Sequence, residues 1–176
     1  MPVAKKNREN AKRAKEMADK LFPGEKWIKV EDGIYLSPRR AIGKKTNYRE
    51  ELRDAQILRD LGSTVYLAPE PRAERNRKFD AIVNGEKMEF KNMHGASFRT
   101  LEEHFLKSRR QAPNVFLNLE KSPLSKREII NALYRARNSA DYAEKSKDFI
   151  GGRIILKING YDSLIYLDVN NLKAPK

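Results

Sequence analysis

Apolar residues along this chain recur in two patterns, and the two patterns predict its helices and strands. Recurrence at every third or fourth position predicts helices, of which the expected ranges are 4–21, 48–60, 98–111 and 125–145. Short alternating or continuous apolar runs predict strands, expected at 27–30, 34–36, 64–67, 114–119, 153–158 and 163–169 and in both arms of 79–92. Asn47 and Ser125 are the residue types expected to cap the second and fourth helices.

This order of elements predicts an α/β (α+β) fold with a mixed central β-sheet flanked by helices. The segment Asn114–Leu119 is apolar on both faces, which is typical of a strand in the middle of a sheet. No run of apolar residues is long enough to span a membrane, and no apolar signal-peptide stretch is present. We therefore expect no membrane partner.

The segment 79–92 predicts a hairpin that turns at Asn84-Gly85, the strongest short-range hairpin signal. A turn at these two residues fixes which residues face each other, and the predicted pairs are Val83 with Glu86, Ile82 with Lys87, Ala81 with Met88, and Asp80 with Glu89. Two facing carboxylates repel each other unless a positive charge lies between them. The Asp80–Glu89 pair therefore suits a divalent cation.

Lys91 lies two residues after Glu89, so it is expected on the same face of the hairpin. Phe90 and Met88 are expected on the other face, together with Phe79, Ala81 and Val83, where they would enter a core. The pattern thus predicts an acidic pair and a lysine on one surface. A charged, solvated face of an edge hairpin is the alternative reading of the same residues.

Composition narrows the chemistry further. The 176 residues include 37 Lys and Arg against 24 Asp and Glu, for a formal net charge of +13. A charge of this size indicates a polyanionic partner, and we expect nucleic acid rather than a membrane surface. The chain has no cysteine and two histidines, which excludes thiolate metal sites and a cysteine nucleophile. Carboxylate chemistry with Mg²⁺, Mn²⁺ or Ca²⁺ remains.

The order of these residues resembles the core of the PD-(D/E)xK nuclease superfamily. The resemblance is strongest to the tRNA nuclease domains at the C-termini of contact-dependent growth inhibition toxins. It is carried by a Glu-bearing helix, an Asp strand, a Glu-x-Lys strand and a later helix followed by an apolar strand. The matching residues are Glu51, Ala55, Leu58, Gly62, Pro69-Glu70, Phe79-Asp80, Glu89-Phe90-Lys91, Lys107, Gln111-Ala112 and Asn114–Leu119. Phe79 stands where the family often has proline.

The resemblance implies a restriction-endonuclease-like core over 47–176, preceded by a basic helix and small hairpin over 1–46. It also implies a metal-dependent nuclease that hydrolyses phosphodiester bonds in RNA, with tRNA as the expected substrate and a toxin-like activity in the cytoplasm. A cognate immunity protein is the implied second partner. A DNA endonuclease of a mobile element and a non-catalytic nucleic-acid-binding protein are the alternatives.

The resemblance also assigns roles to residues of this chain. Asp80 and Glu89 would bind Mg²⁺ (or Mn²⁺), with the carbonyl of Phe90 as a third oxygen ligand. Lys91 would orient the attacking water or stabilise charge on the phosphate.

Glu51 is the expected helix carboxylate, with Glu50 as the fallback and the helix dipole as the alternative partner of both. Gln111 and Lys107 are placed near the phosphate. A solvated helix face is the alternative for these two residues.

Several basic residues are candidates for contact with the nucleic-acid backbone. They are Arg39, Arg40, Arg72, Arg75 and Arg77. His94, in the loop after Lys91, is a candidate general acid, although a lone loop histidine is more often a surface residue.

Overall fold

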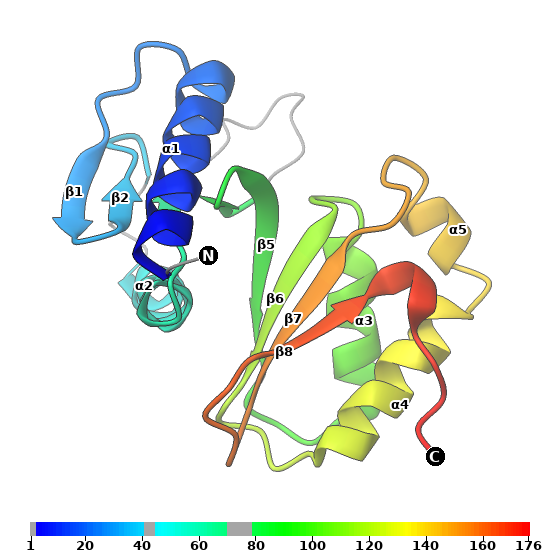
Figure 1. The fold of residues 1–176 in the computed structure, drawn as a ribbon. Helices are drawn as coiled ribbons and strands as arrows, with labels where there is room; N and C mark the ends of the chain where they lie inside the picture. Colours follow the sequence, from blue (N-terminus) through cyan, green and yellow to red (C-terminus); the bar gives the residue numbers. More distant parts are fainter. Residues whose placement is uncertain (1–2, 41–44, 70–78) are drawn as a thin grey trace. The chain divides into compact units, whose positions relative to one another are not determined.

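The computed structural model describes residues 3–40, 45–69 and 79–176 (Figure 1). The chain forms two compact units, unit 1 over Met1–Met88 and unit 2 over Glu89–Lys176. The division falls inside strand β5 (Glu86–Asn92). The domain boundary predicted after residue 46 is a different division of the chain, and it stays a prediction.

Eight strands hydrogen-bond in chain order, from β1 to β8, among the described residues. The pairs β2–β3 and β6–β7 are parallel, and the pairs β1–β2, β3–β4, β4–β5 and β7–β8 are antiparallel. Helices connect the parallel strands, as parallel pairing requires a crossover. The predicted fold class, a mixed sheet flanked by helices, is confirmed.

Unit 1 contains α1 (Val3–Leu21), β1 (Ile28–Glu31), β2 (Ile34–Leu36), α2 (Lys45–Asp60), β3 (Val65–Leu67) and β4 (Ala81–Val83). The small residues Ala14 and Ala18 of α1 are fully buried and pack against Tyr66 and Ile82 of the sheet. Small side chains at helical spacing let a largely polar helix approach the sheet closely. The basic side chains of α1 consequently remain on its outer side.

The hairpin register predicted around Asn84-Gly85 is confirmed for the residues of unit 1. Ala81 pairs with Met88, Ile82 with Lys87, and Val83 with Glu86. Asn84 and Gly85 have φ values of 52° and 90°, as a two-residue hairpin turn requires. Phe79 was wrongly expected beside Ala81 and Val83. It packs with the Ile82 cluster, because β4 begins at Ala81 and strand alternation does not extend to residue 79.

Helix α2 begins at Lys45, three residues earlier than predicted. Asn47 therefore lies inside the first turn of the helix and is not its N-cap. The first turn of α2 holds no acidic residue, so Glu50 and Glu51 are not the helix-dipole partners that the alternative reading proposed. This shift leaves Glu51 available for a different partner.

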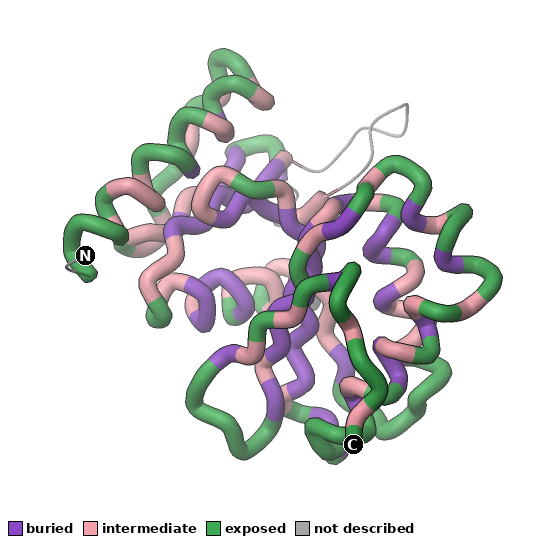
Figure 2. The backbone as a smooth tube through the Cα atoms, turned by 45° about the vertical axis from the view of Figure 1, so that its right-hand side comes forward, coloured by how far each residue is buried: buried purple, intermediate pink, exposed green. Residues whose placement is uncertain are grey.

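Unit 2 contains α3 (Phe98–Ser108), β6 (Asn114–Leu119), α4 (Lys126–Arg137), α5 (Tyr142–Lys145), β7 (Arg153–Ile158), β8 (Ile165–Asp168) and a 3-10 turn over Val169–Asn171. One face of β6 and β7 is covered by α3 and α4, whose buried residues include Leu101, Phe105, Ile129 and Leu133. Buried residues lie on the inner strands and at intervals along the helices, whereas exposed residues dominate the outer turns (Figure 2). All six residues of β6 are buried, which confirms it as an interior strand.

The two helices of this layer end earlier than the sequence predicts. Helix α3 stops at Ser108, after which the N–H groups of Arg110 and Gln111 donate to the carbonyl oxygens of Lys107 and Ser108, three residues back, in place of the helical pattern. Ser125 caps α4 as predicted, in a capping box with Glu128. The helix ends at Arg137, and a separate short helix, α5, follows after the break at 138–141.

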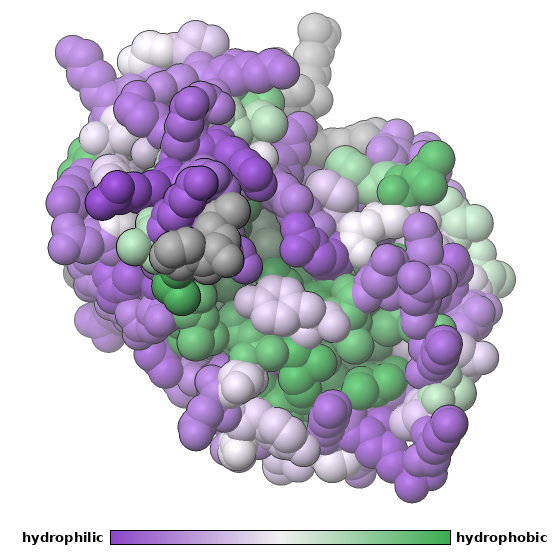
Figure 3. All heavy atoms as spheres, viewed as in Figure 1, coloured by the Kyte–Doolittle hydropathy of each residue, from purple (hydrophilic) through white to green (hydrophobic). Residues whose placement is uncertain are grey.

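Strand β8 lies at the edge of the sheet order. It alternates half-buried Ile165 and Leu167 with exposed Tyr166 and Asp168. Hydrophobic side chains gather over β7 and β8 on the face seen in Figure 3. In the part of the chain that the structure describes, no helix is long and apolar enough to cross a membrane.

Arg109 has a fully buried side chain just after α3. Its guanidinium donates to the carbonyl oxygens of Pro113, of Phe149 at 2.9 Å and of Gly151 at 2.6 Å. It also lies 5.9 Å from the ring centroid of Tyr142. Burial lowers the pKa of Arg109. This one side chain therefore fastens the segment after α5 to the end of α3.

We expect Arg109→Met to destabilise the protein strongly. The substitution keeps most of the buried volume but leaves the carbonyls without their donor, at a cost of about 3 kcal/mol in the free energy of unfolding. Arg110→Met is the matched control, because the side chain of Arg110 is 54% exposed and its ion pair to Glu144 is 3.7 Å long. Urea denaturation of the two variants measures the difference. Equal unfolding free energies for both would contradict this role.

Candidate functional site

The predicted site residues fall into two clusters, one in each unit. The Arg40 cluster consists of Arg40, Glu51 and Asp80 in unit 1. The Lys91 cluster consists of Glu89, Lys91 and His104 in unit 2.

The Arg40 cluster is assembled from a turn, a helix and the ends of two strands. Arg40 ends a turn after β2, closed by its N–H donating to the carbonyl oxygen of Ser37 at 3.0 Å. Glu51 lies on α2. Asp80 immediately precedes β4, and its carbonyl oxygen accepts from the N–H of Ala68, the residue after β3, at 2.9 Å.

The guanidinium of Arg40 bridges the two acids of its cluster. Its Nη2 lies 2.6 Å from Oε2 of Glu51 and 3.4 Å from Oδ1 of Asp80. Its Nε donates to Glu51 at 2.9 Å. Its Nη1 donates to the carbonyl oxygens of Ala68 and, at 3.2 Å, of Asp80. Two carboxylates and two backbone carbonyls therefore fix a single cation.

Arg40 differs in burial from the acids that it bridges. Its side chain is 4% exposed, whereas those of Glu51 and Asp80 are 18% and 23% exposed. Sequence reasoning placed Arg40 among the residues that track phosphates and did not connect it with the acids. The signal that the sequence offers is weak, since Arg40 lies 11 and 40 residues from Glu51 and Asp80.

Strand β5 positions two members of the Lys91 cluster. Glu89 and Lys91 alternate with Phe90, so they share a face of the strand while Phe90 points to the other. Phe90 packs edge-on against Phe116, with ring centroids 5.9 Å apart. The ammonium of Lys91 lies 2.9 Å from Oε1 of Glu89, and the Glu89 side chain is 4% exposed. Lys91 and Glu89 thus form a largely buried ion pair.

His104 is the member of the Lys91 cluster that sequence reasoning missed. It lies on α3, three residues after the buried Leu101, and is half-buried. Burial lowers the pKa of His104, and the positive charges of Lys91 and Lys107 lower it further against the opposing effect of Glu103. Helical spacing from Leu101 was the signal that could have found this residue.

The other candidates of unit 2 lie around the end of α3 and in the loop after β5. Lys107 is exposed in the last turn of α3, and its charge acts on His104. Gln111 is half-buried in the following turn, where its N–H donates to the carbonyl oxygen of Ser108 at 3.0 Å. His94 is exposed in the loop after β5. The catalytic and phosphate-binding roles of these residues stay predictions.

Arg39 is already engaged with a carboxylate. Its Nη2 lies 2.6 Å from Oε2 of Glu25, although its own side chain is 58% exposed. Burial raises the pKa of Glu25, but hydrogen bonds from Arg39 and Ser37 outweigh it and leave the pKa below its ordinary value. Arg72, Arg75 and Arg77, the remaining predicted contacts to nucleic acid, lie outside the described residues.

The side chains around the predicted metal ligands do not fit a resident divalent cation. Within the described residues, no three or more His, Cys, Asp or Glu side chains are placed to hold a metal ion. Arg40 bridges Glu51 and Asp80, and Lys91 pairs with Glu89. Magnesium requires near-octahedral oxygen ligands at about 2.1 Å. A cation at these acids would have to compete with a positive side chain.

The predicted pairing of Asp80 with Glu89 spans the division between the two units. The N–H of Asp80 donates to the carbonyl oxygen of Met88 at 3.1 Å, within unit 1. Glu89 is the first residue of unit 2. The metal-ligand roles of Asp80, Glu89 and the Phe90 carbonyl, together with the facing of the two acids, stay predictions.

The lowered pKa of His104 predicts a pH-dependent loss of stability. The unfolded chain binds a proton near the ordinary pKa of 6.5, above the pKa of folded His104. The free energy of unfolding should therefore fall as the pH drops below the ordinary value towards the folded one. His104→Asn should show a smaller fall. Urea denaturation at neutral and mildly acidic pH tests this, with His94→Asn as the exposed control. An identical fall in wild type and His104→Asn would contradict it.

Comparison with known proteins places a family match over the same part of the chain. Residues 77–150 match the family model described as the contact-dependent growth inhibition CdiA C-terminal domain. No curated protein matches the chain. A solved structure that resembles it is the CdiA-CT/CdiI toxin and immunity complex from Burkholderia pseudomallei, at 20% identity and a TM-score of 0.49 over 70% of this chain and 87% of the other.

The match covers less than half of the 176 residues. It includes Asp80, Glu89, Lys91 and His104, whereas Arg40 and Glu51 precede it. The segment that carries three of the four predicted acidic and lysine site residues is thus similar to the C-terminal domain of contact-dependent growth inhibition proteins.

Proposed function

We propose that this protein is a toxin nuclease that hydrolyses phosphodiester bonds in RNA, with tRNA as its substrate. The observation that carries the proposal is the family match over 77–150, which coincides with the segment holding Asp80, Glu89 and Lys91. The net charge of +13 supports a nucleic-acid substrate. The contact-dependent growth inhibition description supports a toxin that acts on the cytoplasmic RNA of another cell.

Each cluster, taken by itself, holds chemical groups that hydrolysis can use. A water oxygen bonds to phosphorus, the bond to the leaving ribose oxygen breaks, and the leaving oxygen takes up a proton from solvent. We propose that Asp80 is the general base that accepts the proton of the attacking water. Its side chain is the most exposed of the three acids, at 23% against 18% for Glu51 and 4% for Glu89.

Arg40 in unit 1 and Lys91 in unit 2 are each proposed to stabilise the charge of a phosphate bound at its own cluster. The ion pair with Glu89 at 2.9 Å holds the ammonium of Lys91 in one position before substrate binds. A prearranged cation stabilises the charge that develops on the phosphate more than a mobile one does. Within unit 2, Gln111 is proposed to add a hydrogen bond to a phosphate bound at Lys91, and Lys107 a charge beside it.

An immunity protein is the second proposed partner. The solved complex that resembles this chain joins a toxin to its immunity protein, and contact-dependent growth inhibition describes the matched family. A strongly basic toxin predicts an acidic inhibitor surface, since complementary charge speeds association.

Cleavage should depend on the acids and on Lys91 individually. We expect Asp80→Asn, Glu89→Gln and Lys91→Met each to lower the rate of tRNA cleavage at least about 100-fold, because Asp80 and Lys91 act at the transition state and Glu89 holds Lys91 in position. RNA affinity should change little, since it comes from many Lys and Arg residues. A gel cleavage assay on tRNA beside a filter-binding assay separates the two effects.

Asp19→Asn is the matched control, since Asp19 belongs to neither cluster and forms an exposed ion pair with Lys15 at 2.7 Å. It should cleave as the wild type does. Full cleavage by Glu89→Gln would place the active site elsewhere. Cleavage of plasmid DNA in preference to tRNA would support the endonuclease alternative, and binding without any cleavage would support the non-catalytic one.

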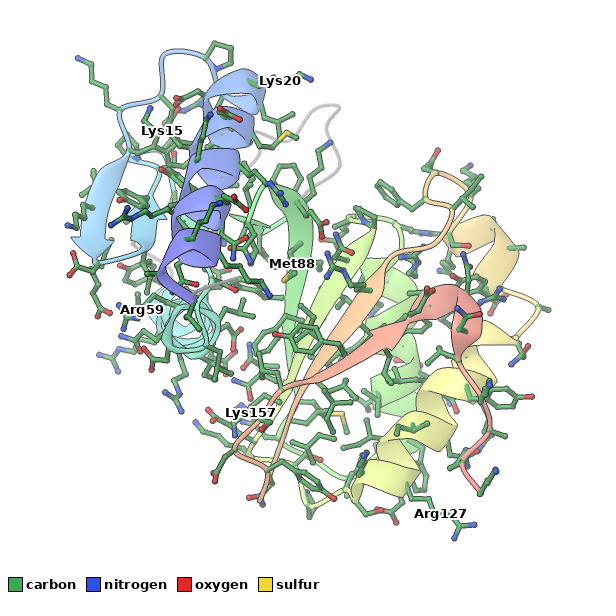
Figure 4. The ribbon with its side chains drawn as sticks, in the orientation of Figure 1. Lys15, Lys20, Arg59, Met88, Arg127 and Lys157 are labelled. Atoms are coloured by element: carbon green, nitrogen blue, oxygen red, sulfur yellow. The ribbon has the colours of Figure 1, made fainter. Side chains whose placement is uncertain are left out.

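Binding to RNA should weaken steeply with salt. Exposed basic side chains that can contact phosphates include the labelled Lys15 and Lys20 of α1 and Arg127 of α4. These side chains extend away from the helices in Figure 4. Release of counterions predicts a slope of about −3 or steeper in log affinity against log salt, which corresponds to four or more neutralised phosphates. Filter binding over a salt series measures the slope. A flat response would indicate a partner other than nucleic acid.

A further inference from the structure

The proposed function leaves open which cation balances the charges of Glu51 and Asp80, the two acids that surround Arg40 in unit 1. Nuclease carboxylates of the predicted type hold a divalent metal ion. In this chain two of them, Glu51 and Asp80, already share the guanidinium of Arg40.

We infer that the guanidinium of Arg40 takes the place of a divalent cation between Glu51 and Asp80, so that this protein cleaves RNA without Mg²⁺. The inference rests on the proposed function. It concerns how that site is charged rather than which substrate it takes.

The hydrogen bonds of Arg40 show a cation that is fixed rather than adventitious. Both outer nitrogens and Nε are engaged, by Glu51, by Asp80 and by the carbonyl oxygens of Ala68 and Asp80. The two carbonyls belong to residues that flank β3 and β4, so the strands themselves set the position of the guanidinium. A surface arginine that paired with these acids by chance would not be 4% exposed.

Charge and geometry oppose a metal ion at the same acids. Mg²⁺ would lie beside a positively charged guanidinium, and the two cations would repel each other. Binding would therefore require the buried guanidinium to leave its carboxylates and carbonyls. Mg²⁺ also keeps several waters, and a planar guanidinium already fills the space between the acids.

Arginine also suits the catalytic task. It carries a permanent charge on a planar group whose donors match phosphate oxygens, as arginines that act on transferring phosphates do. Glu51 then acts as a positioning residue for the cation, whereas Asp80, the more exposed of the two, both positions the cation and accepts the proton of the attacking water.

The first test uses wild-type protein and needs no variant. Cleavage of tRNA should proceed at the same rate with excess EDTA as with millimolar Mg²⁺. Calorimetric titration of MgCl₂ alone into the protein should show no saturable binding. Cleavage that requires Mg²⁺ would overturn the inference and leave the proposed function standing. Failure to cleave under either condition would overturn the proposed function.

The calorimetric arm judges the inference even if cleavage fails. Saturable Mg²⁺ binding by the wild type that is lost in Glu51→Gln would overturn it. The inference also predicts that Arg40→Gln gains Mg²⁺ binding, because two neighbouring carboxylates then lack their cation. The melting temperature of Arg40→Gln should therefore rise with Mg²⁺, whereas that of the wild type should not change.

Arg59→Gln is the matched control for loss of a guanidinium in unit 1. Arg59 lies on α2 and pairs with Glu31 at 3.0 Å and Asp60 at 2.8 Å. This variant should gain no Mg²⁺ binding and should cleave tRNA in EDTA. If Arg40→Gln does not fold, Arg40→Lys keeps one positive charge. It should cleave more slowly than wild type in EDTA, and Mg²⁺ should not restore it. Restoration by Mg²⁺ would contradict the inference.

Discussion

The interaction on which unit 1 depends most is the bridge that Arg40 makes between Glu51 and Asp80. A guanidinium that is 4% exposed joins a helix, the ends of two strands and a turn, through two carboxylates and two backbone carbonyls. Removing one partner from such a buried ionic arrangement leaves the other charges without compensation. The same contacts that fix the loop after β2 thus also fix the acids that the proposed function uses.

Each candidate acid therefore has its negative charge balanced by a positively charged neighbouring side chain. Glu51 and Asp80 have Arg40, and Glu89 has Lys91 at 2.9 Å. The pKa of His104 is lowered by burial and then by the positive charges of Lys91 and Lys107, so this imidazole responds to the charge of the second pair. A site charged in this way can act on a phosphate with cations that belong to the chain itself. This feature distinguishes the account from the metal-centred chemistry that the sequence resemblance implies.

The sequence predicted local features well where one short-range signal decided the structure. Asn84-Gly85 set the hairpin register, and the doubly apolar run Asn114–Leu119 became a fully buried strand. Prediction from the sequence failed where a helix had several plausible first or last residues. Asn47 is a good capping residue, but α2 continues two residues further back. The helix expected to reach residue 145 breaks after Arg137, and a second short helix follows.

Ion pairs between residues far apart in the sequence could not be predicted from such local signals. Arg40 is one of 37 basic residues, and nothing local marks it as buried against Asp80, which lies 40 positions later.

The most direct test of the Arg40 bridge is a crystal structure of the protein grown with Mn²⁺, with anomalous diffraction to locate the metal. The account predicts the Arg40 guanidinium between Glu51 and Asp80 and no anomalous peak there. A manganese peak between these acids, with Arg40 displaced, would contradict it.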